Sequence, residues 1–446
     1  MLLATASTTI TDLTPTDISV DSADAISIAP FKDQLYLAVC RSINETASLD
    51  SQKHDSLVAN AADVELTDVD ATDVGLTDTP VAIAQIYRYS GEGQHWQLVI
   101  QQSLTPASAK SSAKSNSTLN LQCQLSAVSD ANQTWLLAHF CGFEEQLLWA
   151  TKEPDQWQKW PSPVGHRALI QSGLFYQGDL YLRAVDTTTG QMSLFVSKQA
   201  LFESDRQSSE VWQSIALPQE VPSEGVGDDE QPPLITAWSN QSDGLYAAIA
   251  NSDSGFELWR LTQPSGPWTQ LHSGGLQRYS LNAQVAHMVP FQGNFYVATA
   301  QSISQNPNQT PDQALPPAQF ELIRLYNNGD WDLLAGQPRF TPIGLRVPLL
   351  CKGPGFDSAS GELDYLAMHN HQLYLGFQSL EGFQLWHSPN GETWTRRAVP
   401  ELSQYHQLQP FETTSTPFGL VMACNAQTMH GAQSRRLFAY RDSIPL

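Results

Sequence analysis

One unit recurs seven times along the chain, and this repetition constrains the fold more than any other feature. Each copy has a polar turn followed by a run of six to eight mostly apolar residues, with one bulky residue near the start of the run. Such runs predict buried strands that are entered through tight turns. The bulky residues are Tyr36, Trp135, Tyr181, Tyr246, Tyr296, Tyr374 and, in the seventh copy, Val421.

A second mark follows the first in six of the copies. It is a short strand, a polar turn and a tryptophan. In five copies this tryptophan lies eight or nine residues after an aromatic residue or isoleucine of the short strand, namely Tyr87, Trp149, Trp259, Ile323 or Trp386. In the third copy the interval is longer, from Phe195 to Trp212. The pattern predicts hairpins whose tryptophans are equivalent and pack against neighbouring strands. These tryptophans are Trp96, Trp157, Trp212, Trp268, Trp331 and Trp394.

A further apolar stretch precedes each pair of marks, which gives four antiparallel strands in each unit. Seven such units in series, without an amphipathic helical segment, predict an all-β fold, a seven-bladed β-propeller. The whole chain, residues 1–446, is expected to form this single domain. The expected blades cover residues 25–101, 123–163, 168–218, 232–273, 284–335, 362–400 and 409–446.

The seventh unit lacks a fourth strand, because the chain ends shortly after its third strand, RRLFAYRD. The segment TTITDL, residues 8–13, is strand-like and has no partner of its own before the first unit begins. We expect it to pair with the strand that contains Leu437 and Phe438, so that no edge of the ring stays open.

The sixth unit, residues 354–394, carries the elements GF, LYLG, G-x-x-L-W and a closing tryptophan. In this it resembles a widespread and largely uncharacterised bacterial propeller repeat. Its turn, SPNGETW, is similar to the Asp-box hairpin of sialidase-like propellers, although it is one residue shorter and has Asn390 in place of the aspartate. The resemblance implies a propeller fold over nearly the whole chain and does not indicate a ligand.

Charge and composition exclude several classes of partner. The chain has 23 basic and 45 acidic residues and a net charge of −22, whereas nucleic acids and anionic membranes require clustered basic residues. No apolar run is long enough for a transmembrane helix, and the amino terminus lacks the pattern of a signal peptide. The five cysteines are sparse and have no zinc-site spacing, so we expect reduced, buried thiols and a cytoplasmic protein.

Few motifs indicate chemistry. Asp68, Asp70 and Asp73 are spaced like calcium ligands, but the segment lacks the glycine and the final glutamate of a calcium loop. His369 and His371 form an H-x-H pair without nearby carboxylates. No sequence signature of a hydrolase or of a nucleotide-binding loop occurs. We therefore expect no catalytic residue, no metal ion and no cofactor, and we favour a protein that is not an enzyme.

Four arginines, Arg167, Arg278, Arg339 and Arg346, lie in or near the loops between units. Converging arginines are what a sialidase uses to hold a carboxylate, so a glycan-active enzyme is one alternative. A carbohydrate-binding lectin is another. Either would use the loop face or the central channel. The candidate binding residues on the loop face are Arg167, Arg278, Tyr279, Arg339, Arg346, Asp68, Asp70 and Asp73.

Long insertions gather on one side of the predicted ring. In an antiparallel blade the connections from the second to the third strand, and from the fourth strand to the next blade, emerge on the same face. Insertions of this kind occupy residues 41–82, 103–122, 302–318 and 335–362, whereas the insertion at 200–210 lies on the opposite face. Insertions confined to one face typically mark a binding face, although neutral loop growth gives the same pattern.

The favoured function is a non-catalytic binding or assembly module that recognises a protein partner through this face. The insertion at 41–84 has nine acidic and two basic residues and carries −7 of the net charge, which favours a partner with a basic surface. We expect this acidic loop to be dispensable for folding, because it buries little apolar surface.

Overall fold

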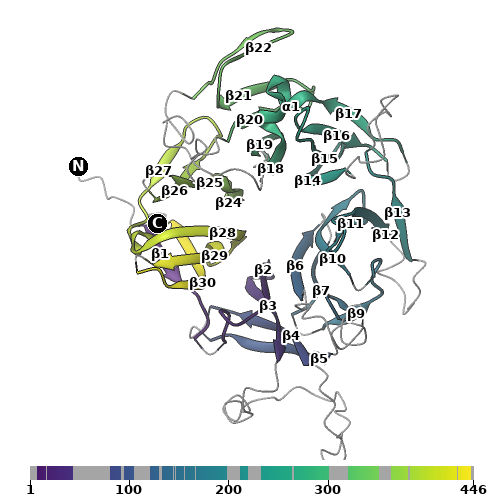
Figure 1. Ribbon diagram of the computed structural model, residues 1–446, viewed down its shortest axis with the longest axis vertical. Helices are drawn as coiled ribbons and strands as arrows, with labels where there is room; N and C mark the ends of the chain where they lie inside the picture. The colour runs from purple at the N-terminus through teal and green to yellow at the C-terminus, as the bar shows by residue number, and fades with distance from the viewer. Residues whose placement is uncertain are drawn as a thin grey trace, which may run out of the picture.

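A computed structural model shows seven four-stranded antiparallel sheets arranged as the blades of a β-propeller (Figure 1). The all-β prediction and the count of seven blades are therefore confirmed. The structure describes residues 8–442, apart from residues 17, 44–80, 92–94, 105–120, 130–132, 144, 146, 155, 166, 198–210, 219–232, 264–265, 301–319, 351–362, 380–381 and 429.

The first four blades take their strands in chain order, from the inner strand to the outer one. Blade 1 has β2 (Ala25–Phe31), β3 (Gln34–Ile43), β4 (Val81–Tyr89) and β5 (Gln97–Leu104). Blade 2 has β6 (Gln122–Ser129), β7 (Thr134–Cys141), β8 (Leu147–Thr151) and β9 (Gln158–Trp160). Blade 3 has β10 (Ala168–Tyr176), β11 (Asp179–Asp186), β12 (Met192–Ser197) and β13 (Trp212–Ile215). Blade 4 has β14 (Leu234–Gln241), β15 (Gly244–Ala250), β16 (Glu257–Leu261) and β17 (Thr269–His272).

The remaining blades complete the ring. Blade 5 has β18 (Gln284–Phe291), β19 (Asn294–Ala300), β20 (Leu322–Leu325) and β21 (Trp331–Ala335). Blade 6 has β24 (Leu363–His369), β25 (Gln372–Ser379), β26 (Gly382–Ser388) and β27 (Thr395–Arg397). Blade 7 has β28 (Tyr405–Thr416), β29 (Gly419–Thr428) and β30 (Gln433–Asp442), with β1 (Thr8–Asp12) as its outer strand.

Blade 7 closes the ring with strands from both ends of the chain. β1 pairs antiparallel with β30, so that Ile10 lies opposite Tyr440 and Asp12 lies opposite Phe438. One residue further on, the backbone N–H of Leu13 donates to the carbonyl of Leu437 at 2.7 Å. The predicted pairing of the amino-terminal strand is therefore confirmed, and β30 has no open edge along this stretch.

The repeated aromatic residues form the packing between blades. Every bulky residue predicted for the second strand, from Tyr36 to Val421, is buried. The six tryptophans all lie at the start of a fourth strand or immediately before it, so their predicted equivalence is confirmed. Three of their indole N–H groups reach a carbonyl at the outer edge of the preceding blade: Trp96 donates to Leu13, Trp212 to Pro161 and Trp268 to Ala216. The repeated aromatic residues therefore pack neighbouring blades against each other.

The helical content of the described residues is small. It comprises the short segment α1 (Gly274–Gln277) and the 3₁₀ turns η4 (Tyr279–Asn282) and η5 (Pro400–Gln404). No helix in this part of the chain has the length and apolar character needed to cross a bilayer. The four cysteines within the described residues are buried free thiols, as predicted, and Cys351 lies outside those residues.

The inner strands of five blades carry a β-bulge at the same level. The bulged residue lies five positions before the end of the strand in each case, for example Gln171 in a strand that ends at Tyr176. Bulges redirect side chains, and they occur more often than expected beside functional sites. The bulged residues are Gln171, Thr236, Ala286, Asp364 and Phe411.

Glu412 joins the inner strands of blades 7, 1 and 2. Its carboxylate accepts the backbone N–H of Ile28 at 2.6 Å, the hydroxyl of Ser27 at 3.0 Å and the side-chain amide of Gln124 at 3.0 Å. Burial favours the uncharged acid more than these hydrogen bonds favour the carboxylate. It therefore raises the pKa of Glu412 from 4.5 to about 7.

This raised pKa predicts a pH dependence of stability. Because the folded protein holds the Glu412 proton more tightly than the unfolded chain, stability is lost as the pH rises from about 4.5 to about 7, by at most about 3 kcal/mol. Glu412→Gln should remove this loss. Thermal unfolding of both proteins between pH 5 and pH 8 measures the difference in slope, and parallel curves would contradict the prediction.

Candidate functional site

A two-stranded hairpin that the sequence pattern did not predict lies between blades 5 and 6. It consists of β22 (Arg339–Thr341) and β23 (Gly344–Arg346), and it extends beyond the rim of the ring (Figure 1). It belongs to the connection between a fourth strand and the next blade, so it emerges on the predicted binding face. Arg339 lies opposite Arg346, and Phe340 lies opposite Leu345.

The two sides of the hairpin have the reverse of the usual polarity. Successive side chains of a strand point to opposite sides, and a surface ribbon normally turns its charged side to water. Here the Arg339 and Arg346 side chains are only 9% and 20% exposed. Phe340 and Leu345 are 80% and 54% exposed, and Ile343 in the turn is 74% exposed. The hairpin therefore offers an apolar side to solvent.

Both inward arginines lie over the same tryptophan. The guanidinium carbons of Arg339 and Arg346 are 4.9 Å and 5.2 Å from the ring centre of Trp331. Arg346 also forms ion pairs with Asp330 and, at 3.6 Å, with Asp332. Since Trp331 begins β21, these contacts attach the hairpin to the outer strand of blade 5.

Glu321 is the centre of a buried polar cluster beneath the hairpin. Its carboxylate is fully buried and lies 2.8 Å from Arg339 Nη1 and 3.3 Å from Arg278 Nη1. The side-chain amide of Asn282 donates to the same carboxylate at 2.7 Å, and so does the backbone N–H of Gln337 at 3.1 Å. One carboxylate thus connects the α1–η4 segment, the start of β20 and the segment that leads into the hairpin.

The electrostatics of this cluster make it unsuited to capture a substrate carboxylate. Burial lowers the pKa of the Arg278 guanidinium; Glu321 opposes this shift and Arg339 adds to it. Arg339 further donates from Nε to the carbonyl of Leu276 at 2.7 Å. Both guanidinium groups are therefore engaged by groups of the protein itself.

The α1–η4 segment has an unusual backbone. Five of its residues have a positive φ, an arrangement that disfavours residues with a Cβ atom. Two glycines allow it, because an added Cβ would lie 2.8 Å from the carbonyl of Asn282 at Gly275, and 2.5 Å from that of Tyr279 at Gly255. The segment presents Tyr279 and Leu281 to solvent, at 61% and 50% exposure. The five residues are Gly274, Gly275, Leu276, Gln277 and Tyr279.

The structure brings together four of the eight candidate residues from the sequence. Arg278, Arg339 and Arg346 surround Glu321 and Trp331, and Tyr279 lies on the adjacent loop. Arg167 lies elsewhere, exposed at the entrance to blade 3, where its carbonyl accepts a hydrogen bond from Thr187. The remaining candidates, Asp68, Asp70 and Asp73, lie outside the described residues.

Sequence reasoning missed Glu321 and the exposed hairpin. Nothing in the sequence marks Glu321 as different from other loop acids, because its partners lie 43 residues before it and 18 after it. The hairpin had a weak signal. In RFTPIGLRV, residues 339–347, arginines alternate with apolar residues around a Pro-Ile-Gly turn. This alternation indicates two short strands, but it does not show whether the arginines or the apolar residues face solvent.

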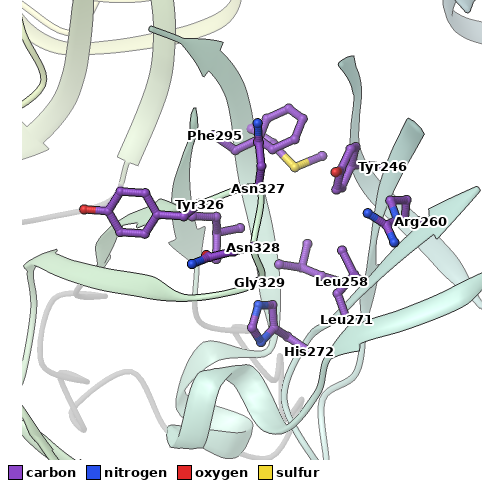
Figure 2. A pocket seen from close by; sticks show the side chains of 12 residues that line it. Tyr246, Leu258, Arg260, Leu271, His272, Phe295, Tyr326, Asn327, Asn328 and Gly329 are labelled. Carbon is purple, nitrogen blue, oxygen red and sulfur yellow. The ribbon is translucent and has the colours of Figure 1, made fainter. Parts of the chain in front are cut away.

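A cavity of about 110 Å³ lies between blades 4 and 5, lined by Tyr246, Arg260, His272, Tyr326 and other residues that Figure 2 shows. It is smaller than the usual ligand pocket. Among the described residues that line it, His272 is the one side chain suited to act as an acid or a base near neutral pH, and no carboxylate, cysteine or serine is among them. The cavity is best explained as a packing gap between blades.

Comparisons with known proteins do not identify a family for this chain. No protein-family model matches the chain, and no curated protein matches its sequence. Among solved structures, a puromycin-hydrolyzing peptidase of Mycobacterium tuberculosis is similar, with a TM-score of 0.46 and 10% identity over 94% of this chain and 55% of the other. The phage phi92 endosialidase has a TM-score of 0.41 and 11% identity, over 99% of this chain and 70% of the other.

A lectin of Aleuria aurantia is also similar, with a TM-score of 0.34 and 11% identity over 73% of this chain and 96% of the other. The chain spans about half the length of the peptidases that it matches. The identities of 10 to 11% and the TM-scores of 0.34 to 0.46 assign no activity to this chain. Since one fold hosts many activities, the function has to be argued from the site.

Proposed function

We propose that the chain is a non-catalytic binding module that recognises a protein partner through the hairpin β22–β23 and the neighbouring α1–η4 segment. The reversed polarity of the hairpin carries this proposal. An exposed cluster of large apolar side chains beside polar residues is typical of protein interfaces. The cluster, called the apolar hairpin surface below, comprises Tyr279, Leu281, Phe340, Ile343, Leu345, Val347 and Leu349.

The support beneath this surface is preorganised. Arg339 is held by Glu321 and by the carbonyl of Leu276, and both arginines lie over Trp331. A surface that is already ordered loses less conformational freedom on binding, which favours affinity. The aromatic and aliphatic side chains at its centre then serve as anchors.

The chemistry favours a protein over a glycan. A sialidase-type site needs free guanidinium groups for the substrate carboxylate, whereas Arg278 and Arg339 are engaged by Glu321. The exposed residues are mainly aliphatic, and neutral sugars are bound by aromatic rings and amides instead. The connection between β3 and β4, which contains the acidic insertion, starts from the same face. We infer a partner with an apolar contact area and a basic margin.

The test uses the double variant Phe340→Ser/Leu345→Ser. Both side chains are mainly exposed, so the melting temperature should hardly change. Binding should fall at least 30-fold if each anchor contributes about 1 to 2 kcal/mol. The measurement is affinity capture with quantitative mass spectrometry from extracts of the cells that make the protein, followed by titration of the retained partner at low and high salt.

Leu98→Ser is the matched control, because Leu98 is an exposed leucine, at 44%, on the outer strand β5. Wild type and Leu98→Ser should retain the same partner, and the double variant should lose it. Equal retention by all three proteins would contradict the proposal. Specific binding on a glycan array that the double variant preserves would favour the lectin alternative instead.

A further inference from the structure

The apolar hairpin surface presents large side chains on one side of the hairpin. Phe340 and Leu345 lie opposite each other in the two strands, so their side chains share a side. Val347 directly follows β23 and precedes a proline, which favours an extended backbone, so it lies on the same side as Leu345 two residues earlier. Together with Ile343 in the turn, these residues are between 48% and 80% exposed. The hairpin thus carries an apolar side beyond the rim of the ring (Figure 1).

The extent of this surface matches what one partner contributes to a stable interface. All seven of its large side chains are about half exposed or more. At on the order of 100 Å² of exposed surface each, they leave roughly 700 Å² of apolar surface in contact with water. A standard interface takes about 800 Å² from each partner, whereas the largest apolar patch of an ordinary monomer is about 300 to 600 Å². The surface is therefore large enough to hold a dimer together by itself.

The distribution of charge lets a second copy of the chain approach at this surface. Two chains with a net charge of −22 each repel one another. None of the seven residues is charged, and the two arginines on the other side of the hairpin are paired with Glu321 and Asp330. Because the hairpin extends beyond the rim, two copies can touch through their hairpins while the charged rings stay apart (Figure 1). Salt screens the remaining repulsion over about 8 to 10 Å.

We propose that the apolar hairpin surface binds the same surface of a second copy of this chain, so that the protein without its partner is a symmetric dimer. A two-fold contact uses one patch on both copies, and an uncharged apolar patch is complementary to itself. This inference rests on the proposed function, because it adds a second occupant to the surface proposed there. The second copy offers apolar contact area but no basic margin, so a basic partner displaces it. Dimer formation thereby keeps the surface covered until that partner binds.

The test is sedimentation velocity of the purified full chain at concentrations from about 0.1 to about 100 μM, which detects a dimer of micromolar or higher affinity. We expect wild type to pass reversibly from monomer to dimer. Phe340→Ser/Leu345→Ser should weaken the dimer at least about 100-fold, because each substitution acts twice in a symmetric contact. Ile343→Asp is a second variant, and it should prevent the dimer because it places two like charges in the contact. Leu98→Ser is the control and should form dimers as wild type does.

Two further measurements identify the contact. The dimer should become tighter as the salt concentration rises from about 50 to about 500 mM, because salt screens the repulsion between two negative chains. A complex with a basic partner should respond in the opposite direction. Hydrogen exchange of the backbone amides of residues 339–347 should be slower at concentrations that favour the dimer than at concentrations that favour the monomer.

Three results would overturn this inference. They are a wild-type protein that stays monomeric at every concentration, a dimer that both hairpin variants preserve, and a dimer that weakens as salt is added. Each of them leaves the proposed function standing, because that function fails only if the double variant retains the captured partner. A dimer that is lost in the double variant while the partner is still retained would contradict the proposed function and support the dimer contact.

Discussion

Deletion of residues 1–14 is expected to destabilise the protein by on the order of 5 kcal/mol, because it removes β1 and opens the ring. The loss includes the backbone hydrogen bonds to β30 and the buried side chain of Leu13, together with the hydrogen bond from Trp96 to the Leu13 carbonyl. It also exposes the edge of β30, an unpaired strand edge that promotes association. Calorimetric melting and size-exclusion chromatography measure the two effects.

A shorter deletion is the control for this experiment. Removing residues 1–7 leaves β1 and its register with β30 intact, so the melting curve should match that of the full chain. Equal melting temperatures for the two deletions would show that β1 does not stabilise the ring. A full-length variant in which only Ile10 and Leu13 are changed to serine should have a melting temperature between those of the two deletions, since it retains the backbone pairing of β1 with β30.

Replacement of Glu321 by glutamine is expected to cost about 3 to 5 kcal/mol of stability. The change preserves the shape of the side chain but leaves Arg278 and Arg339 with uncompensated buried charges. Because Glu321 connects three segments of the face, proteolysis within the hairpin β22–β23 should become faster as well. Denaturant unfolding and limited proteolysis measure these two consequences.

Glu392→Gln is the matched control. Glu392 also pairs with an arginine, Arg324 at 2.7 Å, but its side chain is 62% exposed, so its loss should cost less than about 1 kcal/mol. Arg339→Met should be less harmful in the Glu321→Gln background than in wild type, because the two residues are coupled. Equal, small effects of both glutamine substitutions would contradict the role of the buried cluster.

The blades and the closure of the ring could be predicted from the repeated sequence pattern alone. A strand with Tyr36 or its equivalents, followed by a hairpin with Trp96 or its equivalents, is a short-range pattern, and it stabilises the same local structure wherever it recurs. Counting its copies gave seven blades. The last copy lacks a fourth strand, and residues 8–13 form a strand-like segment without a partner in the first copy. Pairing the two leaves no open edge in the ring, and this is the pairing that the structure has.

The sites could not be predicted in this way, because they are formed by contacts between distant parts of the chain. Glu321 meets Arg278 and Arg339 because the ring places three loops on one face, and this depends on contacts between residues that are distant in the sequence. The alternation of residue types in the hairpin indicated a charged side and an apolar side. The packing of Arg339 on Trp331 determines that the apolar side faces solvent. The bulge at Thr236 likewise has no local signal, because a one-residue shift is set by the pairing of whole strands.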